Sequence, residues 1–265
     1  MLICTLGDLV LDVIVRLESP LVTDGDVPTT TRTGAGGQAG NVAAWAVELG
    51  AEARVLCKLG DDAAAGLVRA DAEEHGVQVL GPVAAGRTGV VVSLVGPGPA
   101  RTMASDRGVA PELAPDELDP AWLEGCDVLH VSGYALLREP IAHAALRARE
   151  LVTGRVSLDL SSAADIAAYG PRRFHALVEQ LAPDVVFAND DERVVLGGLP
   201  APEWVLKLGE RGILLSSGEE LAARPAEVVD TTGAGDALAA GYLVAGPQAA
   251  LDAAARCVGT MGATP

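Results

Sequence analysis

DTTGAGDALAAGYL, at residues 230–243, is a loop of small residues that runs directly into an uninterrupted helical pattern. Because Gly233, Ala234 and Gly235 carry little or no side chain, their backbone can approach an anion closely, and the free N–H groups at a helix start point toward it. The helix dipole adds positive potential at the same place. These features predict a phosphate site in front of a helix.

The first turn of this predicted helix carries Asp236. The dipole favours the ionised carboxylate, which is suited to accept a proton from a substrate hydroxyl. A purely structural interpretation is that Asp230 or Thr231 caps the helix and that the glycines only form a tight turn. The spacing alone leaves both interpretations open.

A second glycine-rich stretch, GGQAGNVA at residues 36–43, opens a helical pattern that continues to Leu49. Paired glycines at 36 and 37 permit backbone conformations closed to other residues and let a ligand lie against the main chain. Asn41, on the first turn, offers both a donor and an acceptor to a polyhydroxylated ligand. This stretch therefore predicts a polar ligand site far from the first one in sequence.

These two stretches, in this order and some two hundred residues apart, resemble the two motifs of the ribokinase-like, or PfkB, family of carbohydrate kinases. The run LGDDAAAG at residues 59–66 is also typical of that family. The resemblance implies an ATP-dependent kinase that phosphorylates a hydroxyl of a sugar or sugar acid. It also implies an α/β fold, a three-layer sandwich with a largely parallel central sheet and a small β-sheet lid.

The resemblance assigns roles to residues at matching positions. Asp236 would be the catalytic base, and the backbone of Gly233, Ala234 and Gly235 would form the anion hole for the transferred phosphoryl group. The residues that would contact the sugar are Asp12, Gly36, Gly37, Gln38 and Asn41. For Asp12, a carboxylate is suited to accept two sugar hydroxyls, although a solvated loop acid is an equal alternative.

The nucleotide side of the resemblance rests on weaker motifs. The residues that would contact ATP are Asn189, Lys207, Gly209 and Gly212. Glu192 would hold Mg²⁺ through water, since magnesium keeps several waters and needs few protein ligands. A monovalent cation near Asp230 is a further implication. Taken alone, Asn189 and Glu192 fit a helix cap, and Lys207 fits an ordinary hairpin.

The rest of the chain alternates short apolar runs with Ala-rich helical patterns, which is typical of helices covering both faces of a parallel sheet. The predicted strands are residues 2–6, 54–58, 128–132, 156–160, 185–188 and 213–216, and the predicted helices are residues 39–49, 62–75, 140–151, 171–181, 234–244 and 247–261. Segments at about 12–33 and 87–104 break this rhythm, the second as a hairpin with a Gly-Pro-Gly-Pro turn at 96–99. We expect them to form the lid of a single domain, 1–265, and a homodimer through the lid strands.

Composition narrows the class of protein. A net charge of −17 argues against nucleic acid or an anionic membrane as a partner. No apolar run reaches the length of a membrane span, and the first residues lack the basic region of a signal peptide. Four scattered cysteines fit packed thiols. These features predict a cytoplasmic protein.

Two alternatives remain for the function. A nucleoside kinase of the same fold would need an aromatic clamp, and the chain has only two Phe and three Tyr. A non-catalytic sugar-binding regulator would not need Asp236, Asn189 and Glu192 together. Ribose is not expected, because Gln38 stands where ribokinases typically carry lysine. A sugar phosphate is less expected, because no Arg or Lys cluster lies near Gly36, which leaves ketohexoses and 2-keto-3-deoxy sugar acids open.

Overall fold

The computed structural model of the chain describes residues 1–96 and 101–265. Its centre is a nine-stranded sheet in the order β15-β14-β13-β12-β11-β10-β1-β4-β6. Strands β6 to β13 in this order run parallel, and only β14 and β15 at one edge are antiparallel. The strands are β1 (Leu2–Leu6), β4 (Glu52–Leu56), β6 (Gln78–Leu80), β10 (Val128–Ser132), β11 (Arg155–Asp159), β12 (Val185–Asn189), β13 (Glu203–Lys207), β14 (Ile213–Leu215) and β15 (Glu220–Leu221).

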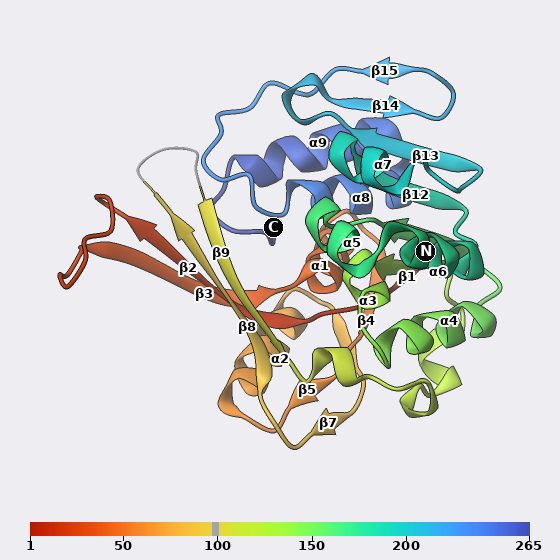
Figure 1. Cartoon of the computed structure of the whole chain (residues 1–265), viewed down its shortest axis with the longest axis horizontal. Coiled ribbons are helices and arrows are strands. Elements are labelled where there is room, and N and C mark those ends of the chain that lie inside the picture. Colours follow the sequence, from red (N-terminus) through yellow and green to blue (C-terminus); the bar gives the residue numbers. More distant parts are fainter. Residues whose placement is uncertain (97–100) are drawn as a thin grey trace.

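Helices cover both faces of this sheet (Figure 1). One apolar core joins the sheet to α1, α8 and α9, and the other joins it to α4 and α6. Along β12, Phe187 faces the first core and Val186 the second, as the alternation of a doubly covered strand requires. The helices are α1 (Gln38–Glu48), α2 (Ala63–Glu74), α3 (Gly133–Leu136), α4 (Ile141–Leu151), α5 (Ala163–Tyr169), α6 (Pro171–Leu181), α7 (Asp190–Leu196), α8 (Ala234–Ala245) and α9 (Pro247–Val258).

A second, four-stranded sheet projects from this body (Figure 1). It contains β2 (Val10–Leu17), β3 (Thr29–Gly36), β8 (Thr88–Val95) and β9 (Arg101–Gly108), in the order β3-β2-β8-β9. Strands β2 and β8 pair in parallel, which joins the two segments that break the α/β rhythm of the sequence. The turn expected at 96–99 falls largely outside the described residues.

The predicted fold class is confirmed: an α/β body with a large, mostly parallel sheet, and a smaller sheet beside it. Helix α6 begins and ends where the sequence pattern predicts, and α8 begins at Ala234 as predicted. The last helix is shorter than expected, because α9 ends at Val258 and not near residue 261. Strand β13 and the short helix α5 were missed by the pattern.

Among the described residues, no helix combines the length and apolar character that crossing a membrane requires. All four cysteines are buried free thiols, as expected from their apolar surroundings.

Candidate active site

Polar residues gather at the carboxyl edge of the parallel sheet. Ser132, Asp159, Asn189 and Lys207 are the last residues of β10, β11, β12 and β13. In open α/β sheets, ligands bind outside the carboxyl ends of the strands. The amino-terminal ends of α1 and α8 meet above this edge, so the two glycine-rich stretches of the sequence border the same place.

The loop before α8 is held by its own acidic residue. The Asp230 carboxylate accepts hydrogen bonds from the Thr232 backbone N–H and hydroxyl, at 2.9 and 2.7 Å, and from the Gly262 N–H at 3.2 Å. Gly233 has a left-handed φ of 76°, and a Cβ there would lie 2.5 Å from the Ala263 Cα. Gly233 is therefore required both by its backbone conformation and by close packing. In the first α8 turn, the Ala234 N–H makes a long hydrogen bond of 3.5 Å to the Thr231 backbone oxygen, and the N–H groups of Gly235 and Asp236 lie at the open start of the helix.

Asp236 lies in the first turn of α8 and meets the first turn of α1. Asn41 Nδ2 donates a hydrogen bond of 2.7 Å to Asp236 Oδ2, across 195 positions of sequence. Gln38, the first residue of α1, also faces the Asp236 carboxylate, and its side-chain amide lowers the pKa of that carboxyl. The Asn41 Oδ1 atom is buried and has no hydrogen-bond partner among the described residues. The structure thus brings together the residues that the two motifs predict as sugar-binding and catalytic.

Burial raises the pKa of Asp236 from 3.8 to about 7. The hydrogen bond from Asn41 and the nearby Lys207 ammonium oppose this rise, and the Asp159 carboxylate adds to it. An aspartate with a pKa close to neutral is ionised in a substantial fraction of molecules and can also hold a proton that it removes from a hydroxyl. This property suits a general base.

A buried ion pair lies beside Asp236. Lys207 Nζ contacts both carboxylate oxygens of Asp159, at 2.9 and 2.7 Å, and the Asp159 side chain is only 1% exposed. A Cβ placed on Gly235 would lie 3.4 Å from the Lys207 Nζ, so the ammonium sits next to the predicted anion hole. Burial would lower the pKa of Lys207, but the carboxylates of Asp159 and Glu192 raise it, so this lysine is charged.

The glycine pair at 36 and 37 makes room for acidic residues of this chain. A Cβ on Gly36 would lie 2.1 Å from the Asp12 Cγ, and one on Gly37, whose φ is 85°, would lie 2.5 Å from the Asp8 backbone oxygen. Burial raises the pKa of Asp12 to about 6. The two glycines therefore serve close packing of β2 and of the loop after β1, and they place the Asp12 carboxyl beside the start of α1.

Asp8 anchors the small sheet to the body. Arg107, near the end of β9, forms a two-pronged ion pair with the Asp8 carboxylate at 2.6 and 2.8 Å and donates to the Tyr134 backbone oxygen at 3.2 Å. These three contacts join the guanidinium to the body of the protein, which makes Arg107 a structural clamp.

The expected nucleotide residues lie farther along the same edge. Asn189 and Glu192 form a reciprocal cap of α7: Asn189 Oδ1 accepts from the Glu192 N–H, and Glu192 accepts from the Asn189 N–H and Nδ2. Burial raises the pKa of Glu192, against the effect of Lys207. Gly212, with a φ of 101°, packs so tightly that a Cβ would lie 2.0 Å from the Leu221 backbone oxygen, whereas a Cβ on Gly209 would meet nothing within 4 Å.

Three polar residues of this site were missed by sequence reasoning. No sequence motif contains Asp159, Ser132 or Ser161. They can be recognised as site residues only once the order of the strands in the sheet is known. Their one signal in the sequence is a polar residue at or just after the end of a buried apolar run. In the fold, both serine hydroxyls donate to Gln38 Oε1.

Comparison with known protein families matches residues 1–258 to the pfkB family carbohydrate kinases, so the chain belongs to this family. It is therefore a kinase, a phosphotransferase that acts on a hydroxyl group, as its sequence motifs predicted.

Individual relatives refine the comparison. The chain is 30% identical over 250 residues to the ATP-dependent ribose-1-phosphate kinase of Halopiger xanaduensis, covering 88% of this chain and 80% of the relative. Its fold is similar to that of an adenosine kinase from Sinorhizobium meliloti, with a TM-score of 0.87 at 23% identity over 99% of this chain and 95% of the other. An uncharacterized sugar kinase from Pyrococcus horikoshii, solved with ATP, has a TM-score of 0.84 at 20% identity over 99% and 95% of the two chains.

Proposed function

We propose that the protein transfers the γ-phosphoryl group of ATP to a hydroxyl of a sugar or sugar derivative, with Asp236 as the base and the backbone of residues 233–235 as the anion hole. The observation that carries this proposal is the 2.7 Å hydrogen bond between Asn41 and Asp236. It joins the predicted sugar motif and the predicted phosphate loop in one site.

The surroundings of Asp236 suit phosphoryl transfer, which depends mainly on positioning and on stabilising negative charge. The amino terminus of α8 supplies N–H groups and a positive dipole end. Lys207 adds a full positive charge beside Gly235, and its ion pair with Asp159 keeps it there. A sugar hydroxyl held by Asn41 and Asp12 would face both Asp236 and the transferred group.

Magnesium would be held at Glu192. Glu192 is 2% exposed, and its carboxylate is held by a hydrogen bond from the Asn189 N–H. It is therefore well placed to orient a water molecule in the hydration shell of the ion. When bound, the ion would neutralise phosphate charge. A monovalent cation near Asp230 fits less well at the carboxylate itself, because both oxygens already accept hydrogen bonds within the protein.

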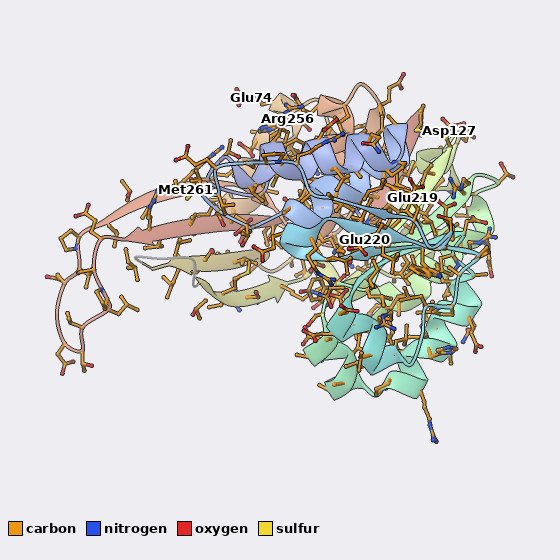
Figure 2. All side chains as sticks on the ribbon, turned by 90° about the horizontal axis from the view of Figure 1, so that it is seen from above. Glu74, Asp127, Glu219, Glu220, Arg256 and Met261 are labelled. Carbon is orange, nitrogen blue, oxygen red and sulfur yellow. The ribbon has the colours of Figure 1, made fainter. Side chains whose placement is uncertain are left out.

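The acceptor class includes sugar phosphates in this proposal, although the sequence near Gly36 made them less expected. The relative at 30% identity is named for ribose-1-phosphate. Strand β3 also carries Arg32 on the same sheet face as Asp12, since Ile14 pairs with Arg32 and Asp12 with Gly34. Met261 lies beside the small sheet in Figure 2, and Arg32 Nη1 donates to its backbone oxygen at 2.7 Å. That bond uses one of the five N–H groups of a guanidinium, which leaves donors for a phosphate.

A nucleoside acceptor is the second candidate. The similar fold of an adenosine kinase is a likeness of fold alone at 23% identity. Tyr134 is an aromatic residue near Asp236, and the charge of this carboxylate helps to raise the pKa of the tyrosine hydroxyl. One aromatic residue does not make the clamp that a purine base would need.

The small sheet would act as a lid and as a dimer surface. Its face opposite Asp12 presents the cross-strand pairs Val13–Val92 and Val15–Leu94, all four side chains half-buried in the single chain. A second copy seated there would cover this apolar strip. Sedimentation analysis of the wild-type chain and of Val92→Lys tests this point, with a dimer expected only for the wild type.

A screen of acceptors for ATP-dependent ADP release tests the proposed function. Ketohexoses, 2-keto-3-deoxy sugar acids, ribose-1-phosphate and nucleosides are each compared with the rate without acceptor. We expect acceptor-dependent ADP release with a sugar-type compound. ATP binding without release in any of these classes would contradict the proposal and favour a sugar-binding regulator.

A further inference from the structure

We propose that Ser132 and Ser161 are positioning residues for the phosphoryl transfer: they orient the side-chain amide of Gln38, which in turn orients Asp236. This inference rests on the proposed function, because it assigns Asp236 the role of base. It adds to that function a support formed by residues from three separate elements of the chain.

The side-chain amide of Gln38 lies between the two serines and Asp236. Ser132 Oγ donates to Gln38 Oε1 at 2.5 Å. Ser161 Oγ lies 2.6 Å from the same oxygen and 3.1 Å from the Asp159 backbone oxygen, and the shorter contact is the one to Gln38. With Oε1 facing the two serines, the amide NH₂ group faces the other side, toward the Asp236 carboxylate, whose pKa it lowers. The opposite orientation of the amide would place its oxygen against the carboxylate, so the two serines and Asp236 select the same orientation.

Gln38 shares this task with Asn41. The two residues are three positions apart in the first turn of α1, so their side chains lie on the same helix face. Asn41 donates a hydrogen bond of 2.7 Å to Asp236, and the Gln38 amide faces the same carboxylate and lowers its pKa. Two neutral amides hold the carboxylate in place without neutralising it, which leaves it able to accept a proton from a substrate.

The backbone at Ser161 shows that this position is specialised. Ser161 has a φ of 70°, in the left-handed region that favours glycine, yet it carries a side chain. Its backbone N–H donates to Asp159 Oδ1 at 3.0 Å, so the same turn also fixes the partner of Lys207. A serine in this strained conformation is explained if its hydroxyl is needed at Gln38.

Other charged and titratable groups also face Asp236, and they must be unchanged in the test. These groups are Asp159 at the end of β11, Lys207 at the end of β13, Tyr134 of α3 and Cys257 of α9. None of them is altered by the variants below, so a shift in the titration of Asp236 reports on the Gln38 support.

The test uses Ser132→Ala and Ser161→Gly in the full-length protein, with two measurements. The carboxyl ¹³C resonance of Asp236, assigned with Asp236→Asn, gives its titration midpoint without requiring turnover. The pH profile of kcat gives the catalytic consequence. In each variant we expect the midpoint to move upward and kcat below the midpoint to fall about threefold to tenfold, which is the factor for one net hydrogen bond.

Folding effects are separated by the choice of Ser161→Gly. Glycine suits a φ of 70°, so the melting temperature of this variant should equal or exceed that of the wild type while activity falls. The matched control is Ser162→Ala, which removes the adjacent hydroxyl that caps α5 by accepting from Asp165 N–H. It should lower the melting temperature and leave the Asp236 midpoint unchanged.

The serines act through Gln38, so their effects must depend on it. In a Gln38→Met background, Ser132→Ala and Ser161→Gly should produce no further shift, whereas independent effects would add. Wild-type midpoints in both serine variants, an additive result in the Gln38→Met background, or an equal shift in Ser162→Ala would each overturn the proposal. Because the resonance is read without substrate, a failure to find any acceptor would refute the proposed function and leave this test standing.

Discussion

Replacing Lys207 with methionine should strongly destabilise the fold, because it leaves a buried charge without its partner. The side chain of Asp159 is 1% exposed and that of Lys207 is 17% exposed. Methionine at position 207 therefore leaves Asp159, the more deeply buried residue of the pair, without its positively charged partner. Loss of one partner of a buried ion pair costs about 3–5 kcal/mol in the free energy of unfolding. The reverse variant, Asp159→Asn, should cost less, because Glu192 and Asp236 remain near the lysine.

The double variant Lys207→Met/Asp159→Asn separates folding from catalysis. With both charges removed, the free energy of unfolding should recover most of the loss, since a neutral pair carries no uncompensated buried charge. Activity should not recover, because the positive charge beside Gly235 is still absent.

Urea unfolding of the wild type and the three variants, followed by ADP-release rates, measures both effects. Exposed pairs are worth at most about 1 kcal/mol. A loss of that size or smaller in Lys207→Met would refute the reasoning, as would a double variant with wild-type turnover.

Three further predictions follow from single residues. The rate of phosphoryl transfer should rise with pH through about 7, because Asp236 ionises there. Between pH 3.8 and about 7 the folded state holds a proton that the unfolded chain releases, so the contribution of Asp236 to the free energy of unfolding falls as pH rises. Both pH dependences should disappear in Asp236→Asn. Gly233→Ala should destabilise the protein more than Gly246→Ala, because both have positive φ but only Gly233 packs against Ala263, and thermal unfolding compares them. If the acceptor is a sugar phosphate, Arg32→Ala should raise its KM about tenfold or more and leave the KM for ATP unchanged, as steady-state kinetics would show.

The parts of the fold that the sequence predicts are those in which local pattern and glycine chemistry agree. Helix α8 begins at Ala234 because the preceding Gly233 has a left-handed φ, and a run of alanine and leucine continues the helix from Ala237. The buried strands β1 and β10 match their predicted ranges because each is an apolar run that stops at a glycine, Gly7 after β1 and Gly133 after β10.

The contacts that complete the site depend on strand order, which no local pattern encodes. Asp159 and Lys207 meet across the intervening strand β12, so neither sequence neighbourhood indicates the pair. Likewise, the glycine pair at 36 and 37 is predicted to admit a ligand, whereas the structure fills the space of both missing side chains with Asp12 and Asp8. Strand β13 was missed because charged residues at both ends leave only three apolar positions between them.

Turnover of Asp236→Asn with an identified acceptor is the most direct test of the central claim that α1 and α8 form one catalytic site around this carboxylate. Asparagine keeps the shape of the side chain and removes its capacity to accept a proton. General base catalysis contributes roughly 10²–10⁴-fold, so kcat should fall by that factor while ATP affinity stays close to the wild-type value. A kcat within a few-fold of the wild type would contradict the account.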